Sequence, residues 1–193
     1  MINCAGKVVY PTPCHRYGLL AIGEAPGRDE EIAGEGFVGS AGKTLDRLLL
    51  KQGISRNDYG RANVYFCRPP NNRKPTATEI DSALPYLIQF LEEVRPKVVL
   101  TIGATPTNVF CGKGSLYSKI ASGRKEHNWQ ASKYLDDAHP LLKPALKYID
   151  YIIPSPHTSP LAFHRNNPDG IKWGTVAAEQ IELAVNLLNS VSI

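Results

Sequence analysis

Long apolar runs are missing from this sequence of 193 residues, and none approaches the length needed to cross a membrane. The first seventeen residues also lack the apolar centre of a signal peptide. We therefore expect an intracellular, cytoplasmic protein with no membrane partner. Internal repeats, linkers and low-complexity tracts are absent as well. This predicts a single domain over residues 1–193, with an arm at 1–17 that is irregular apart from a short strand at 7–10.

Cysteine is scarce, because only four are present, at positions 4, 14, 67 and 111, and no two form a CxxC pair. This pattern predicts neither a zinc knuckle nor a disulfide framework, so we expect reduced thiols. A strong charge imbalance is also missing: the net charge is +4, which is compatible with a polyanion such as DNA without requiring one. With 42% hydrophobic and 21% charged residues, the chain has enough apolar side chains to bury a core.

Strand and helix patterns alternate along the chain. Thr76 followed by Glu79 is a capping box that predicts the start of one helix, although Thr78 is a second candidate for its first residue. The segment 112–147 is the least regular, and we expect one irregular strand in it. The expected strands cover 18–22, 62–66, 97–102 and 148–153, and the expected helices cover about 41–52, 76–94, 105–111 and 171–189. This alternation predicts an α/β fold, a three-layer α/β/α arrangement with a central parallel four-stranded sheet.

The stretch 23–42 is a long glycine-rich loop between a buried strand and a helix. Its end, Gly42-Lys43-Thr44, looks like the end of a phosphate-binding P-loop. That motif requires glycine at position 37, which is Phe37 here, and its loop would directly follow the strand. A nucleotide triphosphatase is therefore disfavoured, and a long loop of this kind is typical of a functional site.

The loops 23–42, 67–75 and 154–165 each follow a predicted strand, and four polar or aromatic residues lie in or near them: Glu24, Phe37, Asn63 and His157. Ligands of parallel α/β sheets bind at the carboxyl ends of the strands. We therefore expect these four side chains to surround one crevice.

The motifs resemble those of the uracil-DNA glycosylase superfamily, most closely its family 4 type. The first segment is Gly-Glu-Ala-Pro-Gly at 23–27 with Phe-Val-Gly-Ser-Ala-Gly at 37–42. The second is Asn-Val-Tyr-Phe-Cys-Arg-Pro-Pro-Asn-Asn-Arg-Lys-Pro-Thr at 63–76, and the last is His-Thr-Ser-Pro-Leu at 157–161. The likeness also includes 95–99 and 102–105, so it extends from about residue 18 to the C-terminus. It implies an enzyme that flips a pyrimidine out of DNA and hydrolyses its N-glycosidic bond.

Site residues follow from this resemblance. Phe37 matches the base-stacking position and Asn63 the base-reading position, and a flipped base is recognised by such contacts. His157 matches the histidine that stabilises the departing base. Ala25 takes the base-binding slot that holds a catalytic Asp in family 1, which leaves Glu24 as the candidate for positioning water. Core packing for Phe37, a local backbone cap for Asn63 and a surface position for His157 are the alternatives.

DNA contacts are expected from the same loops. Leu161 resembles the leucine that fills the gap left by a flipped base, with core packing as its alternative. Phosphate contacts are expected from Ser40 at a helix start and from four rim residues. The rim residues are Arg73, Lys74, Ser159 and Arg165.

The sequence departs from family 4 at the iron–sulfur cluster, which that family holds on an N-terminal CxxC pair and a C-x15-C pair. Cys67 matches one ligand, but sixteen residues later stands Ala83, and the CxxC pair is missing. We therefore expect no cofactor and no metal. Gly36 also replaces the usual proline before Phe37. A DNA-bound, monomeric glycosylase is thus expected. The base that it removes is either uracil or a modified pyrimidine of viral DNA. The alternatives to a glycosylase are a catalytically silent DNA-binding relative and a nucleoside hydrolase.

Overall fold

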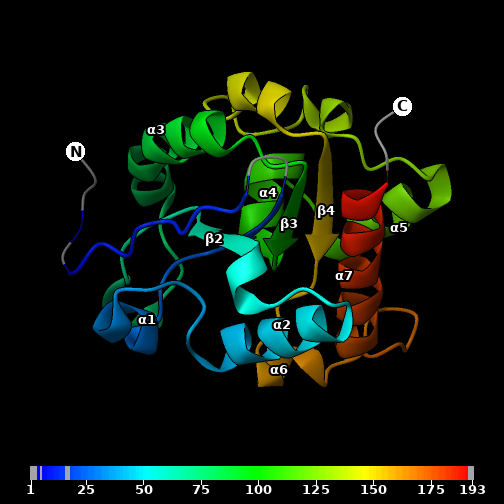
Figure 1. Ribbon diagram of the computed structural model, residues 1–193, viewed down its shortest axis with the longest axis horizontal. Coiled ribbons are helices and arrows are strands. Elements are labelled where there is room, and N and C mark those ends of the chain that lie inside the picture. The colour runs from blue at the N-terminus through cyan, green and yellow to red at the C-terminus, as the bar shows by residue number, and fades with distance from the viewer. Residues whose placement is uncertain (1–3, 5, 16–17, 191–193) are drawn as a thin grey trace.

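Four parallel strands form the centre of the molecule in the computed structural model, which describes residue 4, residues 6–15 and residues 18–190 (Figure 1). Their order is β2-β1-β3-β4. The strands are β1 (Leu19–Gly23), β2 (Tyr59–Asn63), β3 (Val98–Ile102) and β4 (Tyr151–Ser155). Each neighbouring pair is parallel, so all carboxyl ends meet at one edge.

Helices cover both faces of this sheet. They are α1 (Arg28–Ala33), α2 (Ser40–Lys51), α3 (Ala77–Val94), α4 (Ala104–Cys111), α5 (Leu116–Glu126), α6 (Pro160–Phe163) and α7 (Trp173–Asn189). Short 3₁₀ helices occupy Arg56–Asp58, Pro70–Asn72, Ala131–Tyr134 and Lys143–Tyr148. None of the described helices is long and apolar enough to span a membrane.

The strand period of two separates the core into two apolar layers. In β1, Leu19 and Ala21 pack with α2 and α7, while Leu20 and Ile22 pack with α3, α4 and the segment 131–149. All of β1 is buried, as its unbroken apolar run predicts. The predicted three-layer α/β/α fold is confirmed.

Helix α3 forms where its capping box and spacing predict. The Thr76 hydroxyl accepts the Glu79 N–H at 3.2 Å, and the Glu79 carboxylate accepts the Thr76 N–H at 2.7 Å. Thr76, not Thr78, is therefore the N-cap. The buried side chains Ile80, Leu84, Leu87 and Leu91 face the sheet, and burying each contributes about 1.5–3 kcal/mol.

The second and fourth strands differ from their predicted limits. β2 spans 59–63 rather than 62–66, because its register with β1 pairs Tyr59 with Leu19 and Asn63 with Gly23. The aromatic and β-branched residues 64–66 come after it. β4 begins at 151 and extends past its expected limit of 153, so it includes Pro154. An edge strand tolerates proline because one side of its backbone needs no ladder donor.

Three α-helices, α1, α5 and α6, were not predicted. The segment 112–147 holds α5 and two 3₁₀ helices in place of the expected strand. Its strand-like pairing is limited to an isolated bridge between Gln130 and Tyr151. The Ser115 hydroxyl caps α5 by accepting the Ser118 N–H at 3.4 Å. Helix α1 lies inside the long loop and ends at Gly34, whose φ of 72° is the left-handed conformation that glycine favours.

Short antiparallel segments pair with both outer strands. On β2, the Thr12 N–H donates to the Arg61 carbonyl at 2.8 Å, and the Arg61 N–H returns a bond of 2.9 Å. Val8 forms a bridge with Cys67 beyond the strand's end; it is the only bridge within the predicted strand 7–10. On β4, the Ile152 N–H donates to the Trp129 carbonyl at 2.9 Å.

Candidate active site

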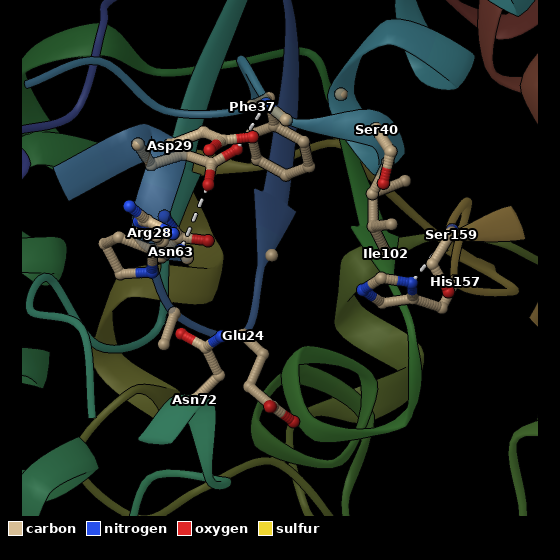
Figure 2. A pocket seen from close by; sticks show the side chains of 18 of the residues that line it. Glu24, Arg28, Asp29, Phe37, Ser40, Asn63, Asn72, Ile102, His157 and Ser159 are labelled. Atoms are coloured by element: carbon tan, nitrogen blue, oxygen red, sulfur yellow. Dashed lines mark hydrogen bonds between the residues drawn. The ribbon is translucent and has the colours of Figure 1, made fainter. Parts of the chain in front are cut away.

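A cleft of about 890 Å³ opens at the carboxyl edge of the sheet, where the loops after β1, β2 and β4 meet. All predicted site residues except Lys74 and Arg165 line it. Those that line it are Glu24, Ala25, Phe37, Ser40, Asn63, Arg73, His157, Ser159 and Leu161. Figure 2 shows Phe37 and Asn63 on one side of the cleft, His157 on the opposite side and Glu24 below. The juxtaposition expected from the strand order is thus present.

Phe37, Asn63 and Gly23 form a narrow slot. Phe37 is 8% exposed and Asn63 is 6% exposed, and both line the cleft. A Cβ on Gly23 would lie 2.6 Å from Asn63 Oδ1 and 2.8 Å from Phe37 Cζ, so only glycine leaves the ring and the amide in place. Of the groups that the structure describes, none hydrogen-bonds the Asn63 amide. The slot therefore offers an aromatic ring beside a free amide.

The backbone at Phe37 is held in an unusual conformation by Arg56. Phe37 has a φ of 59°, which non-glycine residues rarely adopt. The Arg56 guanidinium donates to the carbonyls of Phe37 and Gly36, both at 2.9 Å. It also pairs with Glu35 at 2.8 Å and Asp46 at 2.9 Å, and its hydrogen bonds lower the pKa of the Glu35 carboxyl. Arg56 thus connects the loop to α2.

Glu30 fastens the same loop from inside. Its two carboxylate oxygens accept the backbone N–H groups of Gly27, at 3.1 Å, and Gly39, at 2.7 Å. Glu31 instead pairs with Arg68 at 3.2 Å. These two acidic residues therefore position the loop, whereas Asp29 remains exposed at the cleft.

His157 presents one defined ring edge to the cleft. Its Nδ1 accepts the Ser159 N–H at 3.0 Å (Figure 2). A neutral imidazole with Nδ1 as acceptor carries its proton on Nε2. The side chain is exposed at the cleft, yet the surrounding protein desolvates the ring and lowers its pKa, and the charge of Glu24 opposes this shift. The ring is therefore neutral at pH 7.

Glu24 follows directly after β1. Its carbonyl accepts the Tyr65 N–H at 3.1 Å, and its Oε2 accepts the Thr105 hydroxyl. Ala25 packs beside the small apolar cluster that contains Tyr65 and Cys67. The base of the cleft therefore carries a carboxylate next to an apolar wall.

The residues that are predicted to contact DNA lie on the cleft rim or beside it. Leu161 is 72% exposed, which excludes the core-packing alternative for this residue. Ser40 is exposed in the first turn of α2. Arg73 forms two bonds of 2.8 Å with Glu79, so part of its charge is neutralised within the protein. Lys74 and Arg165 are exposed beside the cleft-lining loops.

Several residues that shape the cleft were not predicted from the sequence. Arg56 lies outside the matched motifs, and Thr105 lies in the matched segment 102–105 but had no role assigned; the partners of both are distant in the chain. Glu30 is one of three consecutive acidic residues in the loop, with Asp29 and Glu31, and was not predicted to position it. Its position three residues after Gly27, at the start of a helix, was the available signal.

The cysteines do not fit an iron–sulfur cluster. Cys4 and Cys67 form a disulfide with a Cα–Cα distance of 5.7 Å, so the expectation of reduced thiols is wrong for this pair. Ala83 packs against Cys67 in the same cluster. Burial raises the pKa of Cys14 to about 11 and that of Cys111 to about 12, which disfavours the thiolates that a cluster needs. In the part of the chain that the structure describes, no group of three or more metal-ligating side chains gathers.

Comparison with known proteins agrees with the motifs. A model of the uracil DNA glycosylase superfamily matches residues 12–175. The type-4 uracil-DNA glycosylase of Archaeoglobus fulgidus is 48% identical over 85 residues, which are 44% of this chain and 43% of the relative. That of Saccharolobus solfataricus is 39% identical over 130 residues, 66% of this chain and 60% of the relative. That of Pyrobaculum aerophilum is 43% identical over 88 residues, 46% of this chain and 45% of the relative. The chain thus spans about half the length of the curated relatives that it matches.

Proposed function

Because this chain belongs to the uracil DNA glycosylase superfamily, we propose that it is a monofunctional DNA glycosylase that removes uracil or a modified pyrimidine from DNA. The observation that carries the proposal is the cleft itself. It brings together an aromatic ring, a free amide, a neutral imidazole and a carboxylate from three separate segments, which follow or end β1, β2 and β4. The product is an abasic site in an otherwise intact strand.

Base recognition is assigned to Phe37 and Asn63. A pyrimidine that leaves the DNA stack loses its stacking partners, and the Phe37 ring replaces them. The Asn63 amide has one acceptor and two donors, which match the N3–H and O4 of uracil. The rotated amide matches cytosine derivatives instead, so the bound base sets the amide orientation. Leu161 enters the gap in the stack.

Bond cleavage is assigned to His157 and Glu24. Negative charge develops on the base as the N-glycosidic bond breaks, and the Nε2–H of His157 donates to the base O2. The neutral state of the ring suits a hydrogen-bond donor that keeps its proton. Glu24 orients the water that attacks the sugar, and its negative charge stabilises the cationic sugar.

DNA is the proposed partner, which implies an intracellular site of action. Exposed Lys74 and Arg165, together with the backbone N–H groups at Ser40, meet phosphates on the rim. We propose that the chain acts on DNA as a monomer.

A base-release assay tests the proposal. Oligonucleotides that contain uracil, hydroxymethyluracil or modified cytosines, each single- and double-stranded, are incubated with the protein and then treated with alkali. Strand scission at the modified position supports the proposal and identifies the base. Salt-dependent DNA binding without scission of any substrate would contradict it and assign a silent DNA-binding relative. Release of base from free deoxynucleosides alone would assign a nucleoside hydrolase.

A further inference from the structure

Thr105 contacts the proposed catalytic carboxylate from a different element. It is the second residue of α4, which follows β3, whereas Glu24 follows β1. β1 and β3 are neighbours in the sheet, so their carboxyl ends bring the two residues together although they are 81 positions apart. The Thr105 hydroxyl donates to Glu24 Oε2. No other hydrogen bond to this carboxylate occurs within the described residues.

Glu24 is consequently held at two points. Its backbone carbonyl accepts the Tyr65 N–H at 3.1 Å, and its side chain is held by Thr105. The first turn of α4 adds the positive end of a helix dipole, which favours a nearby anion. One carboxylate oxygen is therefore occupied, and the other is left for a ligand.

We propose that Thr105 is a positioning residue that aims the free oxygen of Glu24 at the water of the hydrolytic step. This inference depends on the proposed glycosylase function. In that step the water oxygen bonds to the sugar C1′, and the electrons of the broken N-glycosidic bond leave with the base. Glu24 accepts the water proton, which then passes to the base anion. Thr105 acts through Glu24 and does not touch the substrate.

The shape of threonine makes this role separable from packing. Valine matches its volume and branching but lacks the hydroxyl, whereas serine keeps the hydroxyl and loses one methyl group. Thr78 provides a matched control, because it is also the second residue of a helix and also follows an alanine. It is exposed on α3 and lies outside the cleft.

Single-turnover rates on the best substrate of the panel test the proposal. We expect Thr105→Val to lower the rate roughly 10- to 100-fold, the usual effect of losing a hydrogen bond to a charged group. Thr105→Ser should stay within about 3-fold of the wild-type rate, and Thr78→Val should be unchanged. DNA affinity should be equal in all four proteins, since phosphate contacts dominate it. Thr105→Ala serves if the valine variant fails to fold, which thermal melting reports.

A double-mutant cycle with Glu24→Gln separates positioning from a general structural effect. If Thr105 acts through Glu24, Thr105→Val should add less than about 3-fold to the loss in Glu24→Gln. An equal loss in both backgrounds, or a wild-type rate in Thr105→Val, would overturn the inference while base release by the wild type upholds the function. A wild type that releases no base would overturn both.

Discussion

His157 Nδ1 accepts the backbone N–H of Ser159 at 3.0 Å, which leaves Nε2 as the only protonated nitrogen of the neutral ring. Replacing His157 with Ala removes this donor and should lower the single-turnover rate roughly 10²- to 10³-fold, the usual effect of losing one such donor. DNA binding, measured by fluorescence anisotropy, should hardly change. A rate within a few-fold of wild type would place His157 outside the chemistry.

The same hydrogen bond predicts the acid side of the pH profile. Desolvation lowers the pKa of His157 from its ordinary value of 6.5, despite the opposing charge of Glu24. Protonation of Nδ1 would break its bond to Ser159, so the neutral ring is the active form. The single-turnover rate that depends on His157 should therefore stay constant as the pH is lowered to 6.5, and it should fall only below that pH. The lowered pKa also means that stability is lost as the pH falls below 6.5. A loss of activity centred above pH 6.5 in single-turnover rates would contradict this assignment.

Phe37 should contribute an aromatic face as well as packing. Phe37→Leu keeps an apolar side chain in the slot but removes stacking worth about 1–3 kcal/mol, so we expect a large loss of base capture with a small loss of stability. Phe37→Ala should lose both, because a buried aromatic truncated to alanine costs about 3–5 kcal/mol. Single-turnover rates and thermal melts of both variants distinguish the stacking contribution of Phe37 from its packing contribution. Wild-type activity in Phe37→Leu would show that the Phe37 ring serves only to pack the core.

Arg56 should stabilise the loop that carries Phe37. Its guanidinium joins two carbonyls and two carboxylates, and its side chain is only 27% exposed. Arg56→Ala should reduce the free energy of unfolding by about 2–3 kcal/mol, measured by urea denaturation. Arg124→Ala breaks a more exposed pair with Glu179, so its effect should be about 0–1 kcal/mol. Similar losses in both variants would show that the Arg56 network adds nothing specific.

The Cys4–Cys67 disulfide should make stability sensitive to reductants. The two cysteines are 63 positions apart, and a crosslink over a loop of this length contributes roughly 2–4 kcal/mol. Dithiothreitol should therefore lower the melting temperature of the wild type but not that of Cys67→Ser. Intact-mass measurement should find two free thiols, and iron analysis should find none of the metal. A brown protein with about four irons would contradict the assignment.

Local pattern was enough to predict much of the fold. The apolar run 19–22 and the capping box at Thr76 each report on residues that interact nearby, and both elements form as expected. β2 was displaced because Val64 and Phe66 are apolar for another reason: they pack under α3 after the strand has ended. Strand limits depend on the register with β1, which a single segment does not reveal.

The candidate site likewise contains residues that local sequence pattern indicates and residues that only the folded chain brings together. Glu24, Phe37, Asn63 and His157 were predictable, since each lies at or beyond the carboxyl end of a strand and the topology brings these ends together. Arg56 was not, because its role depends on partners 10 to 21 positions away that come close only in the folded chain.

The pairing of both outer strands also hinders association between molecules through open sheet edges. An open sheet edge offers unpaired N–H and C=O groups to other chains, and intermolecular pairing there leads to aggregation. Here the N-terminal segment around Thr12 occupies the edge of β2, and the turn at Trp129 occupies that of β4. Detachment of the segment around Thr12 would expose the β2 edge as a template for cross-chain assembly without disrupting the cleft at the carboxyl ends of the strands. The Cys4–Cys67 crosslink opposes that detachment, so it serves solubility as well as stability.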